Sequence, residues 1–526
     1  MKKIIITDSV DKKVVSVLEN AGLEVNYKPG MKPADIDRVI GLYNGLIVRS
    51  DTKVTSKLIE HMDSMEVVGR AGAGVDNIDI DAATRKGIIV MNTPGGNTIS
   101  TAEHTFTMLL SLCRNIAQAD ASIKAGKWDR KIFKGTEVYG KTLGIFGLGK
   151  IGREVAVRAK AFGMSVIGYD PVLSEDMAAK LGITLTDIES VYKNSDFITV
   201  HVPLDTQTQN LLCKETFELC KDGVKIVNCA RGGIINEDDL VEALNSGKVS
   251  GAALDVYVQE PPDFTHPLFS HPKVITTPHL GANTDEAQEK VAIQIAEQMI
   301  EYFKTKEIKG AVNASALSAF SNKEFAPYVR LCENLGSMLS QIAGKKAKQI
   351  KVILNGELLA NSNGLVATAV LHGYLSKLVH DQVNLVNASI LAKEYGLSFS
   401  EVMSTEHTDY SNLVTIEIRA EKETRRISGT VFSETDFRLV QFDNFKLEIK
   451  PEGNMLFYTN IDRPGMLAAV GTILAENNNI SGLSLGRLGD GKEAMTIIAL
   501  DNPIDRVTLA KIGAIDGIIK IFGVKI

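Results

Sequence analysis

The stretch GIFGLGKIGREVAVRAKAFG, residues 144–163, decides the fold of this chain. It begins as an apolar run, continues with three glycines in the spacing Gly147-x-Gly149-x-x-Gly152, and ends in a helix-like segment. In a dinucleotide-binding turn the first glycine allows a tight turn, the second lets the backbone approach a pyrophosphate, and the third lets helix and strand pack closely. The amides at the start of the helix then face the phosphates. Because these glycines follow a strand and open a helix, the pattern predicts a dinucleotide site rather than a glycine-rich turn without a ligand.

An acidic residue lies where the ribose of a dinucleotide would be bound. The next apolar run ends in Tyr169-Asp170, and Asp170 lies 18 residues after Gly152. A carboxylate at this distance accepts hydrogen bonds from the adenosine ribose hydroxyls and repels a 2′-phosphate. The sequence therefore predicts NAD rather than NADP as the cofactor, and the alternative is an incidental aspartate.

Short runs of isoleucine and valine alternate with helix-like segments on both sides of this motif. Such runs include KKIIIT (2–7), NGLIVRS (44–50), GIIVMN (87–92), KTLGIFG (141–147), GVKIVNCA (223–230) and KVITTPH (273–279). Continuous apolar runs are typical of parallel strands that helices cover on both faces. The alternation predicts an α/β fold with two doubly wound units. Apolar residues at helical spacing predict one long connecting helix over residues 97–128.

The pattern changes after about residue 305. Residues 311–450 predict a mixed α+β unit, with an amphipathic helix near 327–343. In TEHTDYSNLVTIEIRAEKETRRISGTVF (405–432) apolar and polar residues alternate, which predicts antiparallel strands. Residues from Asn454 onward predict the order strand, helix, strand, strand, helix, strand, which is a ferredoxin-like βαββαβ unit.

Composition narrows the class of protein. The chain has 526 residues, 44% hydrophobic and 23% charged, with a formal net charge of −6. Such a balance is typical of a globular protein with several domains and gives no support for a nucleic-acid-binding surface. No apolar run is long enough to predict a membrane span. The five cysteines (Cys113, Cys213, Cys220, Cys229 and Cys332) form no CxxC pair, which favours reduced thiols and a cytoplasmic location.

Polar groups gather at the ends of four apolar runs in the second α/β unit. They lie in HVPL (201–204), NCARGG (228–233), ALDV (253–256) and TPHLGA (277–282). The carboxyl ends of parallel strands form the ligand-binding edge of such a sheet. Arg231 there can bind a carboxylate bidentately, and His279 can move a proton near neutral pH. Glu260 is a plausible partner for His279, and together they suit hydride transfer coupled to proton transfer.

Each of these residues has a simpler explanation. Arg231 could be a surface residue beside a turn, Glu260 could face solvent, and His279 could be an ordinary loop residue. His201 also ends a strand near the expected cofactor site. Spacing alone does not choose His279 over His201.

Five motifs in order carry a resemblance to a known family. GLGKIG (147–152), YDP (169–171), NCARGG (228–233), ALDVYVQEPP (253–262) and TPHLGA (277–282) resemble the D-2-hydroxyacid dehydrogenase family. The resemblance covers essentially the whole chain and is strongest to the long form of the family. It implies Arg231, Glu260 and His279 as the catalytic residues, and so favours His279 over His201.

The same resemblance implies the residues that bind NAD. In addition to Gly147, Gly149, Gly152 and Asp170, they are Lys150, Ile151, Val202, Cys229, Ala230, Arg231, Asp255, His279, Leu280, Gly281 and Ala282. Related sequences often have Thr at the position of Val202, so a side-chain hydrogen bond is lost there. No metal is implied.

Two segments of the first unit and one basic segment resemble the substrate-binding regions of the family. VRSDTKVT (48–55) and GRAGAGVDNID (69–79) place Arg49, Ser50, Gly74 and Val75 against the substrate carboxylate. KWDRKIFKG (127–135) offers Arg130, Lys131 and Lys134 for a phosphate, with a neighbouring subunit as one source of this segment. A solvated basic turn is the alternative for these three residues.

The C-terminal segment TNIDRPGMLAAV (459–470) resembles the first turn of an ACT domain. In such domains this loop binds amino acids at an interface between two ACT units. The resemblance implies Asn460, Asp462 and Asn479 as ligands of L-serine. An ACT domain that only dimerises is the alternative, because a fold does not by itself imply a live site.

The resemblance also implies the domain organisation and the activity. A substrate-binding domain comprises residues 1–97 and 283–310, an NAD-binding domain 98–282, an intervening domain 311–450 and an ACT domain 453–526. The expected activity is NAD-dependent oxidation of 3-phospho-D-glycerate to 3-phosphohydroxypyruvate, the first step of L-serine biosynthesis, in a homo-oligomer (dimer or tetramer) regulated by serine. A glyoxylate or hydroxypyruvate reductase is one alternative, and a non-catalytic NAD-sensing regulator is another.

Overall fold

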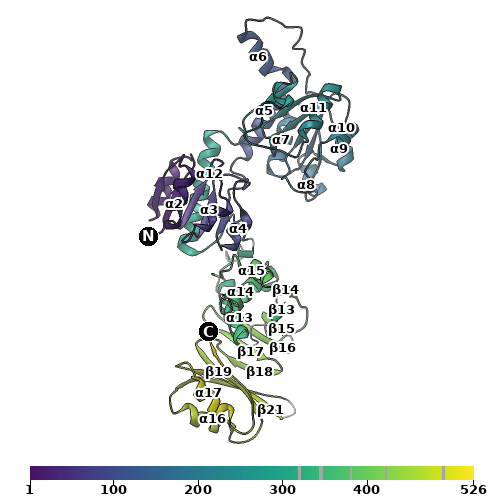
Figure 1. The fold of residues 1–526 in the computed structure, drawn as a ribbon. Helices are drawn as coiled ribbons and strands as arrows, with labels where there is room; N and C mark the ends of the chain where they lie inside the picture. Colours follow the sequence, from purple (N-terminus) through teal and green to yellow (C-terminus); the bar gives the residue numbers. More distant parts are fainter. Residues whose placement is uncertain (315, 318–321, 343–346, 380–381, 421–422, 489–491) are drawn as a thin grey trace.

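Four lobes follow one another in the computed structural model, each built around its own sheet (Figure 1). The structure describes residues 1–314, 316–317, 322–342, 347–379, 382–420, 423–488 and 492–526. The lobe that contains the chain's N-terminus lies between the lobe of α7–α11 and the lobe of α13–α15 (Figure 1). The C-terminal lobe lies at the far end of the row.

The first lobe is a five-stranded parallel sheet with the order β2-β1-β3-β4-β5. Its strands are β1 Lys3–Ile6, β2 Glu24–Tyr27, β3 Gly45–Val48, β4 Val67–Arg70 and β5 Ile89–Met91. Its helices are α1 Lys13–Asn20, α2 Pro33–Val39, α3 Ser56–Glu60 and α4 Ile80–Arg85, with the short η1 Ile40–Leu42. All four residues of β3 are buried, as the continuous apolar run predicts.

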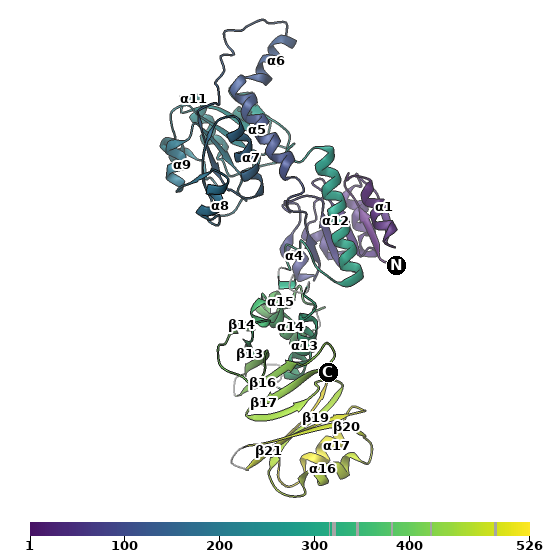
Figure 2. The ribbon, with the colours of Figure 1, turned by 180° about the vertical axis from the view of Figure 1, so that it is seen from behind.

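A helix from much later in the chain completes the first lobe. Helix α12, Asp285–Thr305, packs against α1 and β4 and lies across this lobe in Figure 2. The side chains of Ile295 and Met299 lie so close to Gly69 in β4 that a Cβ there would collide with them. Strand alternation alone would not have shown this return of the chain.

The second lobe is a seven-stranded parallel sheet with the order β12-β11-β10-β9-β6-β7-β8. Its strands are β6 Thr142–Phe146, β7 Ser165–Tyr169, β8 Thr184–Leu185, β9 Phe197–Val200, β10 Val224–Asn228, β11 Val249–Leu254 and β12 Val274–Thr276. Its further helices are α7 Lys150–Ala161, α8 Glu175–Lys180, α9 Ile188–Asn194, α10 Lys214–Leu219 and α11 Glu237–Ser246, with η2 Pro267–Ser270. The order reverses between β6 and β9, which is the switch point where doubly wound sheets bind ligands.

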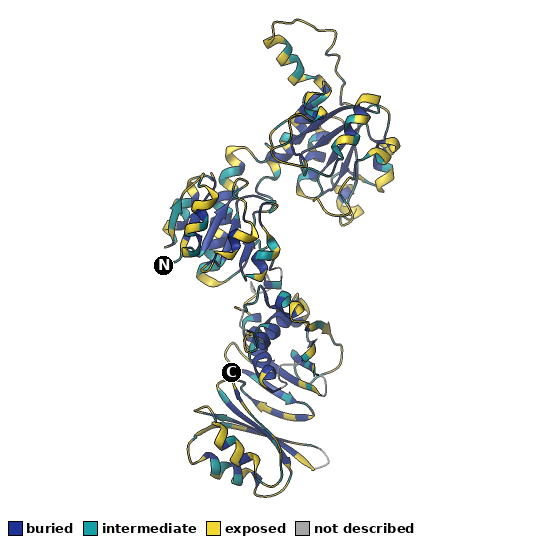
Figure 3. Ribbon diagram, viewed as in Figure 1, coloured by how far each residue is buried: buried dark blue, intermediate teal, exposed yellow. Residues whose placement is uncertain are grey.

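The single long helix predicted over 97–128 is wrong. The structure has two helices there, α5 Thr98–Arg114 and α6 Ile116–Lys124. Asn115 lies between them in the left-handed conformation, with φ of 52°, which ends α5. Helix α6 buries no residue, and Figure 3 shows its residues as exposed or intermediate.

The third lobe is a six-stranded sheet covered by helices. Its order is β14-β13-β15-β16-β17-β18, with strands β13 Ala347–Asn355, β14 Ser398–Met403, β15 Leu413–Ala420, β16 Thr424–Val431, β17 Phe437–Phe442 and β18 Phe445–Ile449. Its helices are α13 Phe325–Ile342, α14 Leu365–Leu375 and α15 Ala388–Glu394, with η4 Leu359–Asn361. The predicted amphipathic helix is confirmed to Ile342, and its last position, 343, lies outside the described residues. The predicted antiparallel pairing is confirmed between β15 and β16.

The fourth lobe has the predicted βαββαβ order. Its elements are β19 Asn454–Ile461, α16 Met466–Leu474, β20 Ile480–Arg487, β21 Glu493–Leu500, α17 Arg506–Gly513 and β22 Ile518–Lys525, and the antiparallel sheet has the order β20-β21-β19-β22. One face of the sheet packs on α16 and α17 through Leu456 and Val470. The other face joins the core of the third lobe, where the rings of Phe442 and Phe457 lie 5.8 Å apart.

Two expectations from composition concern membrane spans and cysteine pairing. Among the described residues, no helix combines the length and the apolarity that crossing a bilayer requires. All five cysteines are free thiols, as predicted from their spacing.

Candidate active site

A cleft of about 670 Å³ lies between the first and second lobes. The loops after β3 and β4 line one side, and the loops after β9, β10 and β12 line the other. The second-lobe loops converge because parallel strands end at the same edge of the sheet. Most residues predicted to bind substrate or the nicotinamide end of NAD line this cleft: Arg49, Ser50, Gly74, Val75, Ile151, Val202, Cys229, Ala230, Arg231, Glu260, His279, Leu280, Gly281 and Ala282.

His279 and Glu260 form a hydrogen-bonded pair at this edge. His279 Nδ1 lies 2.8 Å from Glu260 Oε2, and both side chains are partly exposed to the cleft. Burial alone would raise the pKa of Glu260, but the hydrogen bond and charge of His279 and the amide of Tyr257 outweigh burial and lower it. Glu260 therefore stays ionised and leaves the Nε2 atom of His279 for another partner.

Arg231 is fixed at the tip of β10 by the motif that surrounds it. The buried Asn228 side chain donates to the carbonyl of Arg231 at 2.8 Å and accepts from the amide of Ala230 at 2.9 Å. A Cβ at Gly232 would collide with the carbonyl of Tyr257, so the turn after the arginine requires a glycine. Arg231 Nε lies 3.1 Å from a carboxylate oxygen of the exposed Asp76 in the first lobe. The NCARGG motif thus delivers one guanidinium to the cleft.

His201 lines the cleft but has a different environment. Its Nε2 lies 3.1 Å from the Thr199 hydroxyl, and its buried Nδ1 has no hydrogen-bond partner within the described part of the chain. Burial lowers the pKa of His201 to about 4. With no carboxylate to stabilise its charged form, His201 suits proton transfer near neutral pH less well than His279.

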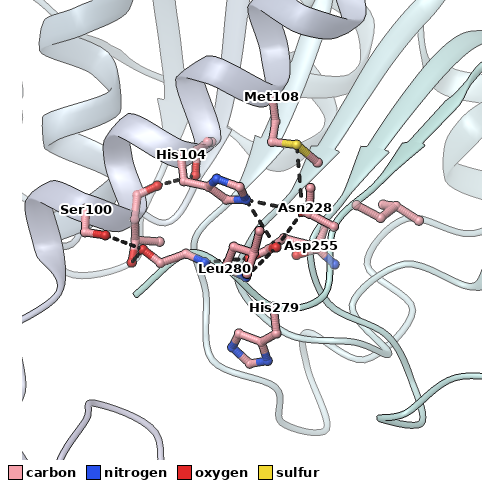
Figure 4. A network of polar contacts seen from close by, with 12 residues as sticks. Ser100, His104, Met108, Asn228, Asp255, His279 and Leu280 are labelled. Atoms are coloured by element: carbon pink, nitrogen blue, oxygen red, sulfur yellow. Dashed lines mark hydrogen bonds and ion pairs between the residues drawn. The ribbon is translucent and has the colours of Figure 1, made fainter. Parts of the chain in front are cut away.

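Asp255 holds the loop that carries His279 (Figure 4). Its fully buried carboxylate accepts hydrogen bonds from the amides of Leu280 at 2.7 Å and Gly281 at 2.8 Å. His279 itself has a φ of 55°, a left-handed conformation that costs a non-glycine residue about 1–3 kcal/mol. Asp255 was predicted as an NAD contact; it does not line the cleft, and its carboxylate fastens the loop that carries His279.

The glycine-rich turn fits a dinucleotide. Gly147 has a φ of 89°, and a Cβ at Gly152 would collide with the carbonyl of Gly147. Gly149 faces open space, and α7 begins directly after it at Lys150. Backbone amides at the helix start are therefore accessible to a pyrophosphate.

Asp170 follows β7 and is tied to this turn. Its carboxylate accepts from the amides of Leu148, at 2.8 Å, and of Val172 and Leu173, each at 2.9 Å. Burial would raise the pKa of Asp170, but these amides outweigh it and lower the pKa. An ionised carboxylate beside the turn can accept hydrogen bonds from the ribose hydroxyls of NAD, and it repels the 2′-phosphate of NADP.

Two more charged residues in the first lobe escaped the sequence reasoning. Arg70, at the end of β4, lines the cleft with Arg49 and donates from Nε to Asn77 at 3.1 Å. Burial, with the charge of Arg231 next, lowers the pKa of Arg70 to about 10. The buried Asp8 accepts from the amide of Arg49 at 2.6 Å and so fastens the loop after β3. A lone arginine closing an apolar run, as at NCARGG, was the available signal for Arg70.

The basic segment does not reach the cleft of its own chain. Arg130, Lys131 and Lys134 are exposed, lie beyond α6 and do not line the cleft. They belong to the extension that leaves the second lobe at its outer end (Figure 1).

The three predicted serine ligands are not brought together within one chain. Asn460 and Asp462 lie at one end of β19, where Asp462 pairs with Arg487. Asn479 precedes β20 at the opposite end of the sheet, since Ile480 pairs with Leu500 and Leu500 with Asn454. The distance along the strands is roughly 20 Å.

Comparison with known proteins places the chain in a family. The family model "D-isomer specific 2-hydroxyacid dehydrogenase, NAD binding domain" matches residues 106–281, and "D-3-phosphoglycerate dehydrogenase intervening domain" matches 324–443. A D-3-phosphoglycerate dehydrogenase of Bacillus subtilis is 40% identical over 507 residues, covering 96% of both chains. One of Archaeoglobus fulgidus is 39% identical and covers 98% of both. The chain belongs to the D-3-phosphoglycerate dehydrogenase family.

Family membership accounts for the cleft and the cofactor. The NAD-dependent formate dehydrogenase of Staphylococcus aureus, solved in complex with NAD, superimposes with a TM-score of 0.54 at 30% identity. It covers 59% of this chain and 97% of its own. The expectation of NAD as cofactor is confirmed by this neighbour and by the match to an NAD-binding domain. The D-3-phosphoglycerate dehydrogenase relatives cover the C-terminal lobes as well, so the long form predicted from the sequence is confirmed.

Proposed function

We propose that this protein oxidises 3-phospho-D-glycerate to 3-phosphohydroxypyruvate with NAD, the first step of L-serine biosynthesis. The observation that carries the proposal is the His279–Glu260 pair opposite Arg231 in one cleft. A protein that only sensed NAD would not need a proton-transfer pair beside an arginine. The domain limits 1–97 with 283–310, 98–282, 311–450 and 453–526 are part of this proposal.

The chain's own residues supply three functions in this reaction. The glycine-rich turn and Asp170 would hold NAD, which would supply the acceptor for the hydride that leaves C2 of the substrate. Arg231 binds the substrate carboxylate bidentately, with the backbone of Gly74 and Val75 beside it. His279 Nε2 takes the proton of the C2 hydroxyl as the carbon becomes a carbonyl, and Glu260 stabilises the resulting imidazolium.

Three arginines in the cleft suit a substrate with two anionic groups, and the carboxylates of Asp51, Asp76 and Glu260 line the same cleft. Arg49 and Arg70 line the first-lobe side, whereas Arg231 lines the second. A 2-hydroxyacid without phosphate, such as the substrates of a glyoxylate or hydroxypyruvate reductase, needs only one anion clamp. We assign Arg70 to the 3-phosphate, supplemented by Arg130, Lys131 and Lys134 of a second copy, and we keep Arg49 with the substrate carboxylate.

An exposed apolar extension supports a homo-oligomer. On α6 and in the segment after it, Trp128 is 78% exposed and Ile132 is 69% exposed, with Ile116 and Ile123 more than half exposed. Apolar groups gathered on one extension are typical of a protein interface. A second copy that covers this extension would carry its basic residues to the partner's cleft. The cytoplasmic location and the choice between dimer and tetramer remain predictions.

The separation of Asn479 from Asn460 and Asp462 supports a serine site shared by two ACT units. Within one chain, Asn479 lies too far from Asp462 for both to bind the same serine. A two-fold axis would bring Asn479 of one copy to Asp462 of the other. An apolar strip on the edge strand β20, with Leu483 and Leu485 exposed, offers a surface for such pairing. An ACT domain that dimerises without binding serine is the alternative.

The activity is tested by following NADH formation at its absorbance wavelength. We expect NADH from 3-phosphoglycerate and NAD, and a much lower rate from D-glycerate, which lacks the phosphate. No NADH from 3-phosphoglycerate, together with rapid NADH oxidation by glyoxylate or hydroxypyruvate, would replace the proposal with the reductase alternative. Absence of turnover with every substrate, with NADH still bound, would favour a sensor.

A further inference from the structure

His104 lies behind the catalytic loop, where the proposed mechanism does not use it. It comes from α5, and its Nε2 lies 3.1 Å from Asp255 Oδ1 and 3.3 Å from the Thr277 hydroxyl (Figure 4). The Thr277 hydroxyl in turn donates to Asp255 Oδ1 at 2.6 Å. His104 does not line the cleft, so any effect on the reaction must pass through Asp255 and Thr277.

Asp255 depends on its partners because it is fully buried. Burial would raise its pKa, and the hydrogen bonds from His104, Thr277 and the Leu280 amide outweigh burial and lower it. The other titratable groups near this carboxylate are Cys229 from β10, Tyr257 and Glu260. Burial and the charge of Asp255 raise the pKa of Cys229, so its thiol stays neutral. Within the described part of the chain, His104 is therefore the titratable group that can offset the buried charge.

The same face of α5 holds the loop at a second point. The hydroxyls of Ser100 and Thr101 donate to the carbonyl of Gly281 at 2.8 and 3.1 Å. Ser100 and His104 are four residues apart, so they lie on one face of the helix. His279, at its left-handed φ, is also held by its own amide, which donates to the carbonyl of Asp255 at 2.9 Å. Helix α5 thus supports the loop on both sides of the catalytic histidine.

His104, Cys229 and Asp255 also bring three potential metal-ligand atoms within 4.8 Å of one another. Both oxygens of Asp255 already accept backbone amides, and a metal would require the neutral thiol of Cys229 to lose its proton. The hydrogen-bond network accounts for the arrangement without an ion.

We propose that His104 is a positioning residue for the dehydrogenase reaction: its Nε2 donor keeps the Asp255 carboxylate aimed at the 277–281 loop, and so keeps His279 in its reactive position. The inference rests on the proposed function, since it assigns His104 a role in the step that His279 performs. His104 lies outside the cleft and belongs to none of the five family motifs.

Two substitutions and one matched control test this. His104→Leu removes the donor, whereas His104→Gln keeps a donor near the position of Nε2. His266→Leu is the control, because His266 Nε2 pairs with Asp238 Oδ1 at 3.0 Å away from the cleft. For each full-length variant we would measure kcat, KM for 3-phosphoglycerate, Kd for NADH, Tm, and hydrogen exchange of peptides covering residues 277–283.

We expect His104→Leu to lower kcat about 10-fold or more, the effect of losing a hydrogen bond to a charged group. KM and Kd should change less than twofold, exchange of the 277–283 peptides should become faster, and His104→Gln should restore both kcat and protection. His266→Leu should match the wild type. The acidic limb of the kcat profile should move to higher pH in His104→Leu, because Asp255 loses a partner that lowers its pKa.

Unchanged kcat and unchanged loop exchange in His104→Leu would overturn the inference. A fall in kcat accompanied by equal losses in NADH affinity and Tm, or a similar fall in His266→Leu, would also overturn it. If the wild type does not oxidise 3-phosphoglycerate, the proposed function fails, while loop exchange still decides whether His104 positions the loop.

Discussion

The catalytic cleft and the C-terminal sheet assemble their polar residues in opposite ways. In the cleft, Arg231, Glu260 and His279 follow different strands, yet they meet within one chain because parallel strands end at one edge. In the C-terminal sheet, Asp462 follows the end of β19, whereas Asn479 precedes the start of β20. Because both strands pair antiparallel with β21, they run in the same direction, and the two residues lie at opposite ends of the sheet. The comparison teaches that a site is complete in one chain when its residues all follow the carboxyl ends of parallel strands, and is divided when one residue follows a strand and another precedes one.

The two regions also differ in how firmly their polar groups are fastened. In the cleft, buried Asn228 and Asp255 hold the backbone on either side of the reactive residues. In the C-terminal sheet, Asp462 is paired with the exposed Arg487, and Asn479 donates to Asp501 at 2.8 Å near the surface. A second copy could therefore rearrange the tail at small cost, whereas the cleft is preorganised.

The largest expected effect comes from removing the proton acceptor of the cleft, His279. His279→Ala removes the proton acceptor, so kcat should fall by about 10²–10⁴-fold, the usual contribution of general acid–base catalysis. Kd for NADH should stay close to the wild-type value, since the glycine-rich turn is separate from His279. Steady-state rates and NADH fluorescence measure the two quantities. Normal turnover in this variant would remove His279 from its role.

The next effect concerns the cofactor end of the cleft. Asp170→Ala removes the carboxylate beside the glycine-rich turn, so Kd for NADH should rise about 10-fold or more and the preference for NAD over NADP should narrow. Asp187→Ala serves as the control, because Asp187 caps α9 with the same chemistry outside the cleft. If the preference stays unchanged, Asp170 does not contact the ribose.

A smaller effect is expected at the serine site that two C-terminal lobes are proposed to share. Asp462→Ala and Asn479→Ala should each remove inhibition by L-serine when present in every chain. In mixed oligomers that contain one chain of each variant, about half of the inhibition should return, because a two-fold interface then keeps one intact site of two. Rates with and without serine measure this. No recovery in the mixed species would contradict a shared site.

The smallest expected effect comes from pH and the Glu260 pair. The pKa of Glu260 is lowered in the folded protein, so its contribution to stability is present above about pH 4.3 and is lost as pH falls through the lower folded value. The pair is partly exposed, so Glu260→Gln should lower Tm by at most about 2–4 °C near pH 7. Thermal unfolding should show this difference shrinking below pH 4. A difference that grows toward acid pH would contradict the assignment.

Much of the fold could be predicted because local patterns determine it. The apolar runs and the Gly147-x-Gly149-x-x-Gly152 spacing predict the parallel sheets, and the last 73 residues, from Asn454, predict βαββαβ. The break at Asn115 could not be predicted, since apolar residues keep helical spacing beyond it. The left-handed conformation of Asn115 ends α5, and α6 beyond it buries no residue.

The site was predictable where motifs mark strand ends and not where support is long-range. Arg231, Glu260 and His279 stand in recognisable turns, whereas His104 reaches Asp255 from a helix about 150 residues earlier in the chain. The polar residues Ser100, Thr101 and His104 in the first half of α5 were the available signal. The opposite positions of Asp462 and Asn479 required the strand register.

The central claim is that Arg231, Glu260 and His279 of one chain catalyse the reaction together, whereas the serine site needs residues from two chains. The most direct test uses oligomers purified through two different tags, with one chain carrying His279→Ala and the other Arg231→Ala. We predict that 3-phosphoglycerate oxidation by these mixed oligomers stays at the low level of the two single variants. Recovery of a substantial fraction of wild-type kcat would contradict the claim, because it would mean that Arg231 of one chain serves His279 of another.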